Sequence, residues 1–392
     1  MGQVLDRIDV VAEEIRGQAV QSEADCRLTD TAAALLRDSG AIRLLQPKLY
    51  GGYEVHPPRV RRDRHGSRRT RRCERMGHRD RRRAPVGTGV RDPQVQEEIW
   101  GEDNDTWMAS PYAPMGVATP VDGGYVLKGR WSFSSGTDHC QWAFLGAMVG
   151  DGEGGIAMPP SSLHVILPRT DYQIVEDTWD VIGLRGTGSK DLIVDGAFVP
   201  GYRTLNASKV MDGRAQKEAG RPEPLFNMPY SCMFPLGITA AVIGITEGAL
   251  ACHIAVQKDR VAITGQKIKE DPYVLSAIGE SAAEINASRV SLIETADRFY
   301  DKVDAGKVIT FEERAIGRRT QIAAAWRAVR AVDEIFARAG GGALHYKTPM
   351  QRFWRDAHAG LAHAVHVPGP TNHASALTQL GGEPQGMMRA MI

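Results

Sequence analysis

Cysteine is scarce in this sequence, with five among 392 residues. The cysteines are odd in number, far apart and never in a C-x-x-C pair: Cys26, Cys73, Cys140, Cys232 and Cys252. Zinc ligand sets and disulfide frameworks both need paired cysteines at regular spacing, so both are disfavoured. The N-terminus also lacks the basic-then-apolar pattern of a secretory signal. The sequence therefore predicts a cytoplasmic protein.

The sequence also lacks an excess of charge of one sign. Its formal net charge is +1, so no overall field favours nucleic acid or a membrane surface. One long apolar run covers residues 233–256, but it contains Pro235, Glu247, His253 and three glycines. These residues favour a buried helix of a soluble protein over a membrane span. We expect neither a membrane nor nucleic acid as a partner.

The near-neutral total hides a segment rich in arginine. Residues 59–83 contain thirteen Arg against three acidic residues, a local charge of +10, which leaves −9 for the remainder. A basic arm for nucleic acid is disfavoured, because the segment interrupts a helical region and has no aromatic residue among the arginines. When residues 73–80 are back-translated with GC-rich codons and the resulting DNA is read one base later, it encodes an ordinary apolar helix fragment. We therefore interpret residues 56–89 as frame-shifted. Translated as written, the segment predicts local disorder, because so many arginines cannot be buried unpaired.

Hydrophobic periodicity divides the chain into three parts. Apolar residues recur at helical spacing near the N-terminus, and a second helical unit covers residues 29–39. Short alternating segments follow, with a hairpin signal at residues 122–124. Beyond them the chain is helical again, with an apolar stripe over residues 322–336 that stops at three glycines. The prediction is an α+β fold with an N-terminal helical domain, a central antiparallel β-barrel or sheet domain and a C-terminal helical bundle, over residues 1–105, 106–210 and 211–392.

The segment from Trp131 to Trp142 contains the clearest candidate for a ligand site. It ends a strand-like stretch with two adjacent hydroxyls, Ser134 and Ser135, followed by a glycine. Such a turn can present hydroxyl and backbone N–H groups to a flat polar ligand, with the nearby aromatic residues as walls. A second polar turn, at residues 110–116, lies one strand earlier and can line the same cleft. A redox ring with several hydrogen-bonding edges suits this arrangement.

Three other motifs have plainer explanations. Residues 183–189 look like a phosphate loop, but they lack the strand–loop–helix context, so a glycine-rich turn between strands is favoured. Arg260 follows the long apolar run, where it can complement a helix end or reach a phosphate of a neighbouring subunit's ligand.

The C-terminal tail is rich in histidine but has no nearby carboxylate to complete a set of metal ligands. We therefore predict no metal site and favour one histidine as an acid or base. The histidines are His345, His358, His363, His366 and His373.

Six motifs occur in a specific order: Leu45-Gln-Pro with Gly51-Gly52, Gln96-Glu-Glu-Ile-Trp-Gly, Tyr112-Ala-Pro-Met-Gly, residues 131–139, residues 183–189 and residues 351–360. In these six motifs the chain resembles the acyl-CoA dehydrogenase superfold. Within it, the chain is most similar to the oxygenase components of two-component flavin-dependent phenol hydroxylases, of the seco-steroid hydroxylase and 4-hydroxyphenylacetate hydroxylase types. The similarity covers nearly the whole chain outside the arginine-rich segment. It implies a C-terminal four-helix bundle and a homo-oligomer, usually a tetramer, with sites shared between subunits.

The resemblance also implies which residues contact a flavin. A turn that borders the cofactor contains Ser110, Pro111 and Tyr112. A strand end with a serine hydroxyl near flavin N5 contains Phe133, Ser134 and Ser135. The arginine that contacts the flavin phosphate is Arg260, and the loop that approaches from another subunit contains Gly341 and Gly342. His363 and Ala364 match the position beside the reactive edge of the ring. A tryptophan that touches the flavin in the family corresponds to Met76.

The residue at position 364 separates two activities of the superfold. Many acyl-CoA dehydrogenases place a glutamate there, to remove the proton alpha to a thioester, and the methyl group of Ala364 cannot do so. His363 beside it is a suitable base for a phenol. The resemblance therefore implies a monooxygenase. An acyl-CoA dehydrogenase-type flavin oxidoreductase and a nucleic-acid-binding protein are the alternatives.

The implied activity is the ortho-hydroxylation of a phenolic substrate, steroid-derived phenols included. A separate flavin reductase supplies reduced FMN or FAD, which diffuses in and reacts with O2 to give a flavin C4a-hydroperoxide. Ser134 or Ser135 would hold N5, and His363 would accept the phenol proton.

Overall fold

The computed structural model describes residues 2–55, 87–390 and 392. Met76 and residues 56–86 of the arginine-rich segment lie outside this range. The frame-shift interpretation and the predicted tryptophan position therefore stay predictions.

The N-terminal part is helical, as predicted. Helix α3 begins after Thr29, whose hydroxyl accepts a hydrogen bond from the Ala32 N–H, and it ends before Gly40, which has φ 71°. Its buried face packs against Trp107 and Cys140 at the edge of the sheet. The helices are α1 (Gly2–Gly17), α2 (Ala19–Ala24), α3 (Asp30–Asp38) and α5 (Pro93–Trp100).

An eight-stranded sheet follows, in the order β6-β7-β3-β2-β4-β5-β8, with β1 paired to β4. The predicted hairpin at residues 122–124 joins β2 to β3. The α+β class is confirmed, but the sheet is mixed rather than antiparallel, since β4 runs parallel to β1 and β2. After β3 the chain crosses over to the other side of β2 instead of turning back in a second hairpin, which gives β4 the direction of β2. The strands are β1 (Met108–Ala109), β2 (Pro114–Val121), β3 (Gly124–Ser134), β4 (Trp142–Val149), β5 (Ser162–Pro168), β6 (Gln173–Val175), β7 (Lys190–Pro200) and β8 (Thr204–Asn206).

Trp131 fixes the end of β3 in the core of the sheet. Its side chain is fully buried, and its Nε1–H donates to the Gly146 carbonyl oxygen at 2.7 Å. The ring lies over Gly116 and Gly129, where an added Cβ would come within 2.2 and 2.9 Å of ring atoms. The two glycines are therefore needed for the indole to pack here, and the packed indole holds the strand that leads into residues 133–135.

The C-terminal part contains the predicted four-helix bundle, made of α8 (Tyr230–Asp259), α9 (Pro272–Asp304), α10 (Phe311–Ala337) and α11 (Pro349–Leu361). Helix α10 begins with a capping box of Thr310 and Glu313 and ends before Gly340, which has φ 78°. Shorter helices flank the bundle: α6 (Ala207–Asp212), α7 (Arg214–Ala219), α12 (Pro368–Gln379) and α13 (Gly386–Ala390).

Among the described residues, α8 is the one helix whose length and composition would allow it to cross a membrane. It packs against α9, α10 and α11, and more than half of its most apolar window is buried. These contacts are those of a bundle core helix, as predicted.

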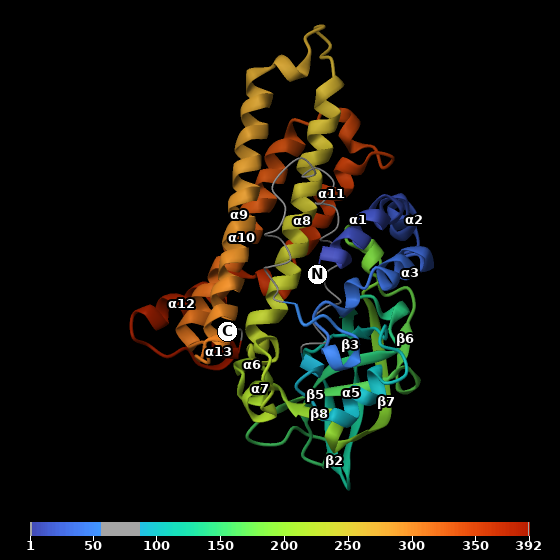
Figure 1. Cartoon of the computed structure of the whole chain (residues 1–392), viewed down its shortest axis with the longest axis vertical. Helices are drawn as coiled ribbons and strands as arrows, with labels where there is room; N and C mark the ends of the chain where they lie inside the picture. Colours follow the sequence, from blue (N-terminus) through green and yellow to red (C-terminus); the bar gives the residue numbers. More distant parts are fainter. Residues whose placement is uncertain (1, 56–86, 391) are drawn as a thin grey trace.

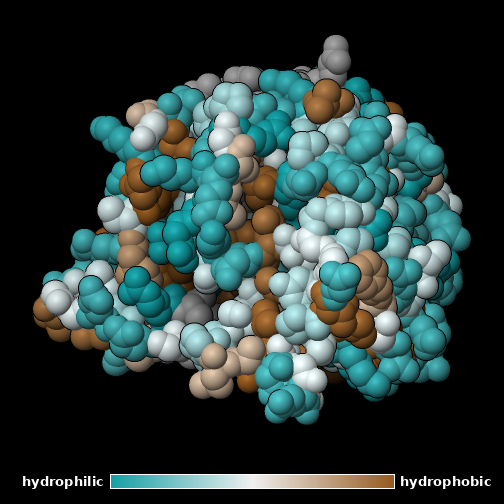
Figure 2. Space-filling model, turned by 90° about the horizontal axis from the view of Figure 1, so that it is seen from below, coloured by the Kyte–Doolittle hydropathy of each residue, from teal (hydrophilic) through white to brown (hydrophobic). Residues whose placement is uncertain are grey.

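The three parts meet beside the middle of the bundle (Figure 1), where α1–α3 lie next to α8 and α11, above the sheet. The face seen from below is mainly hydrophilic, and hydrophobic residues line a groove near its middle (Figure 2).

Candidate active site

The last residues of β3 expose one aromatic side chain. Phe133 has φ 63°, a left-handed conformation that a bulky residue rarely adopts, and is 69% exposed. Its ring packs edge-on against Trp179, with the ring centroids 6.0 Å apart. The pairing of β3 with β7 shifts register between Trp131 and Ser134. This irregularity turns Phe133 out of the sheet toward solvent.

The two predicted serines have different surroundings. Ser134 has no exposed surface, and its hydroxyl donates to Thr137 Oγ1 at 3.3 Å. The Ser135 hydroxyl is partly buried and lies 2.8 Å from the Ser189 hydroxyl, which lies 2.7 Å from Thr187 Oγ1. Ser135 thus ends a chain of three hydroxyls, and such a chain can orient the O–H of its last member.

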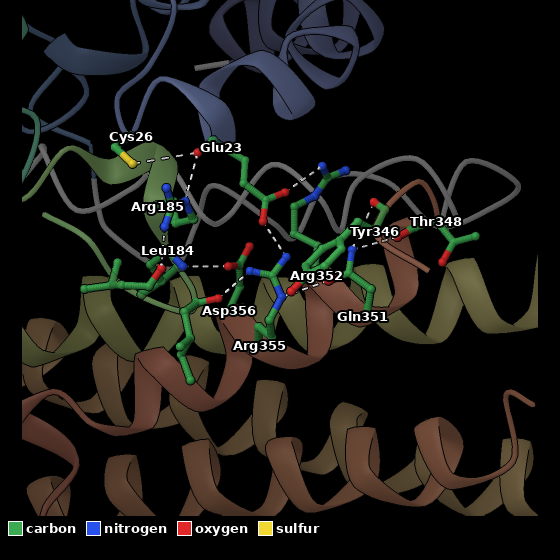
Figure 3. Close-up of polar contacts among 12 residues, drawn as sticks. Glu23, Cys26, Leu184, Arg185, Tyr346, Thr348, Gln351, Arg352, Arg355 and Asp356 are labelled. Atoms are coloured by element: carbon green, nitrogen blue, oxygen red, sulfur yellow. Dashed lines mark hydrogen bonds and ion pairs between the residues drawn. The ribbon is translucent and has the colours of Figure 1, made fainter. Parts of the chain in front are cut away.

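The glycine-rich segment at residues 183–189 is a turn between β6 and β7, as the sequence favours, and contains the short helix η9 (Arg185–Thr187). It packs on α11 (Figure 3), where the Leu184 N–H donates to Asp356 Oδ1 at 2.6 Å. An added Cβ at Gly183 would come within 2.5 Å of the Arg355 carbonyl oxygen. The turn that contains Ser189 is therefore tied to the bundle.

The predicted turn at Ser110, Pro111 and Tyr112 directly follows β1. Pro111 is buried and Ser110 is partly buried. The Tyr112 ring packs against Phe234 and Tyr230 of α8, with centroid distances of 5.0 and 5.6 Å. Tyr112 thus connects the sheet with the N-terminal end of α8.

His363 caps the short helix η14 (Ala364–His366), which follows α11. Its ring Nδ1 accepts a hydrogen bond from the Val365 N–H at 3.1 Å, and both His363 and Ala364 are exposed. Val365 is buried in the cluster that contains Tyr230 and Phe234, against which Tyr112 packs. The structure therefore brings the 363–366 turn and Tyr112, predicted from segments far apart in sequence, to one place.

Three side chains hold this turn, and the sequence reasoning missed the first two of them. Arg318 Nη2 donates to the Val365 carbonyl oxygen at 2.9 Å, and Trp326 Nε1 donates to the His366 carbonyl oxygen at 2.9 Å. The buried His366 ring lies 3.1 Å from Thr239 Oγ1. A signal for Arg318 was present, because it lies four residues before Ile322 on the apolar stripe of α10 and so falls on its buried face.

Arg260 and the glycine loop meet at the other end of the bundle. Arg260 Nη1 donates to the Ala339 carbonyl oxygen at 3.0 Å, and an added Cβ at Gly340 would come within 2.2 Å of Arg260 Nη2. Gly341 and Gly342 are exposed. Arg260 follows the last residue of α8, whereas Tyr112 packs near the first, so a helix of roughly 45 Å separates them. Within one chain, Arg260 and the loop do not reach the site of Tyr112 and His363.

The tail histidines do not converge. His358 Nε2 lies 2.8 Å from Asp333 Oδ1, His366 is buried, and His345 and His373 are exposed. Over residues 2–55 and 87–390, no group of three or more His, Cys, Asp or Glu is placed to hold a metal ion.

The residues near β3 fit a flavin. An exposed aromatic ring at Phe133 and an oriented hydroxyl at Ser135 offer one apolar face and one hydrogen-bonding edge. A redox ring of this type needs both.

The fold places the protein in the acyl-CoA dehydrogenase class, and residues 236–368 match the family model described as the acyl-CoA dehydrogenase C-terminal domain. The chain is 52% identical to a pigment production hydroxylase of Rhodococcus erythropolis, over 100% of this chain and 99% of that protein. It is 39% identical to the flavin-dependent monooxygenase oxygenase subunit HsaA of Mycobacterium tuberculosis, over 93% and 92% of the two chains. The crystal structure of 3-HSA hydroxylase from Rhodococcus sp. RHA1 superposes with a TM-score of 0.88 at 33% identity, covering 98% of each chain.

The chain belongs to the family of flavin-dependent monooxygenase oxygenase components. It is an oxidoreductase that uses reduced flavin, and a separate flavin reductase is its partner. These relatives confirm the predicted enzyme class.

Proposed function

We propose that this oxygenase hydroxylates a phenol at the carbon ortho to its hydroxyl group, with reduced FMN or FAD that diffuses in from the reductase. Relatives named resorcinol hydroxylase and p-hydroxyphenylacetate 3-hydroxylase support a phenolic substrate, and the 3-HSA hydroxylase similarity supports a steroid-derived one. The main observation in support of the proposal is that Tyr112 and the turn that contains His363 pack in the same hydrophobic cluster.

In this proposal the flavin ring lies against the end of β3. Phe133 would offer its exposed ring to the flavin, Ser135 would supply a hydrogen bond to N5, and Ser110, Pro111 and Tyr112 would complete the site. Ser135 is favoured over Ser134 because Ser134 has no exposed surface. Bound reduced flavin supplies the reducing equivalents and the activation of O2. The protein residues position the ring and exclude water from it.

His363 takes the phenol proton. Its Nδ1 accepts from the Val365 N–H, so the neutral ring carries its proton on Nε2. The imidazole therefore has to give up this bond, which is worth about 1 kcal/mol, before a nitrogen can take the phenol proton. The phenolate that results is more electron-rich at the ortho carbon. Proton transfer of this kind contributes a rate factor on the order of 10² to 10⁴.

Arg260, Gly341 and Gly342 contribute to the flavin site of another subunit. Support comes from their position, since they lie together but a helix length away from the site of their own chain. The assembly that we propose is a homotetramer in the cytoplasm.

The test is to supply dithionite-reduced FMN or FAD and O2 to the purified enzyme with a panel of phenols, and to follow products by mass spectrometry. We expect a product heavier by one oxygen atom, with two adjacent hydroxyl groups. No product above the flavin-only control for any phenol, together with bleaching of bound flavin by an acyl-CoA, would overturn the proposal.

A further inference from the structure

A cavity lies next to the candidate flavin site, with a lining of its own. Its volume is about 390 Å³, and it is lined by α1, α2 and α3 on one side and by the 184–187 turn and α11 on the other. Ligand pockets in proteins typically start at about 300 Å³. Phe133, Ser135 and His363 are not among its lining residues.

The walls of this cavity are mainly apolar. Ile8, Leu28 and Leu36 line it from the N-terminal helices, and Ile245 and Phe353 line it from the bundle. Such walls favour a ligand with an extended apolar surface, because each Å² that they remove from water contributes about 25 cal/mol.

The cations around the cavity mostly have carboxylate partners. Arg16 pairs with Glu13, Arg185 Nη1 lies 3.0 Å from Asp180 Oδ1, and Arg352 Nη1 lies 3.3 Å from Glu23 Oε2 (Figure 3). Lys347, the remaining cation of the lining, is exposed at the surface. A carboxylate or phosphate ligand would therefore find no buried cation to pair with, so an uncharged ligand is favoured.

Asp356 is one of two carboxylates in the lining of the cavity, and the other, Glu23, pairs with Arg352 and Arg355. Asp356 Oδ1 accepts from the Leu184 N–H, and within the described part of the chain this is its one hydrogen bond. The other carboxylate oxygen can accept a hydrogen bond from a ligand. Burial raises the pKa of Asp356 to about 6, as expected for a carboxyl group among apolar walls.

The cavity also touches the hydroxyl chain of the candidate flavin site. Thr187 lines the cavity, and its hydroxyl lies 2.7 Å from Ser189, which contacts Ser135 at 2.8 Å. A ligand that displaces Thr187 would therefore change the orientation of the Ser135 hydroxyl.

We propose that this cavity is a binding site for an uncharged aromatic molecule with a hydroxyl group, whose O–H donates to Asp356. The choice of an aromatic alcohol rests on the proposed function, since the substrate and product of the enzyme belong to this class. The site is separate from the one at which the reaction takes place.

The test uses 2-naphthol, whose fluorescence reports binding, in titrations of the full chain at pH 7.5 without flavin. Asp356→Asn keeps an oxygen for the Leu184 N–H but replaces the second acceptor by an NH2 group. We expect its affinity for 2-naphthol to fall about tenfold. The control Asp180→Asn changes an exposed carboxylate that precedes the 184–187 turn and does not line the cavity, and it should bind like the wild type.

Val20→Trp provides a second test, because Val20 lines the cavity and is 67% exposed, so a larger side chain can obstruct it without disturbing the core. This variant should also lose affinity. Equal affinity in the wild type, Asp356→Asn and Val20→Trp would overturn the inference. Binding that depends on Asp356 without any phenol hydroxylation would instead refute the proposed function and leave the cavity site standing.

Discussion

Arg318 and Val365 share a hydrogen bond of 2.9 Å that fixes the turn of His363. The Val365 carbonyl oxygen accepts from the Arg318 guanidinium, while the Val365 N–H donates to His363 Nδ1. Arg318 is almost fully buried, and burial lowers its pKa to about 10. Arg318 thus acts on His363 through the backbone of a single residue, Val365, and is a positioning residue.

Replacing Arg318 by Lys should lower kcat for hydroxylation about tenfold, since a hydrogen bond to a charged group is worth about 1.5–3 kcal/mol. The dissociation constant for reduced flavin should change little. Guanidinium ion added to Arg318→Ala should restore part of the activity. The matched control is Arg314→Lys, one turn away on α10, where the arginine binds the Ile392 and Ile309 carbonyl oxygens. Equal activities of the two Lys variants would contradict this role.

Replacing Ser135 by Ala should weaken the binding of reduced flavin about tenfold, because it removes the last hydroxyl of the Ser135–Ser189–Thr187 chain. Ser134→Ala should have a smaller effect, because that hydroxyl is buried and bonded to Thr137. An anaerobic titration of reduced FMN measures both. The reverse order of effects would assign the flavin contact to Ser134.

Replacing His363 by Asn should reduce product formation by a factor on the order of 10² or more, while reduced flavin still binds. The Asn side-chain oxygen can take over the capping bond to the Val365 N–H, so the turn should persist. Product formation and flavin oxidation are measured in parallel, to show whether the two become uncoupled. Unchanged product formation would remove His363 from the mechanism.

His164 should make the protein sensitive to acid. Burial, reinforced by the Arg91 guanidinium, lowers the pKa of His164 to about 3. The unfolded chain binds a proton below pH 6.5 and the folded chain does not, so stability is complete above this pH and is lost as the pH falls. The cost is about 1.4 kcal/mol per pH unit, or about 2 kcal/mol at pH 5. Urea unfolding at pH 7 and pH 5 should show a smaller difference for His164→Leu than for the wild type. His373→Leu, which changes an exposed ring, serves as the control.

Local signals in the sequence predicted local structure well. The helical unit over residues 29–39, the hairpin at residues 122–124 and the glycine stop after α10 were each marked by local patterns. The parallel pairing of β2 with β4 was not visible, because it depends on which strands become neighbours in space. The roles of Arg318 and Asp356 depend in the same way on contacts across more than forty residues of sequence.

The left-handed backbone of Phe133 has an energetic cost. A bulky residue in this conformation costs the folded state about 1–3 kcal/mol, whereas glycine adopts it without strain. Replacement by glycine would therefore relax the chain while removing the exposed ring. The fold therefore bears local backbone strain at position 133 together with an exposed aromatic ring, a combination that agrees with the proposed contact of this ring with the flavin.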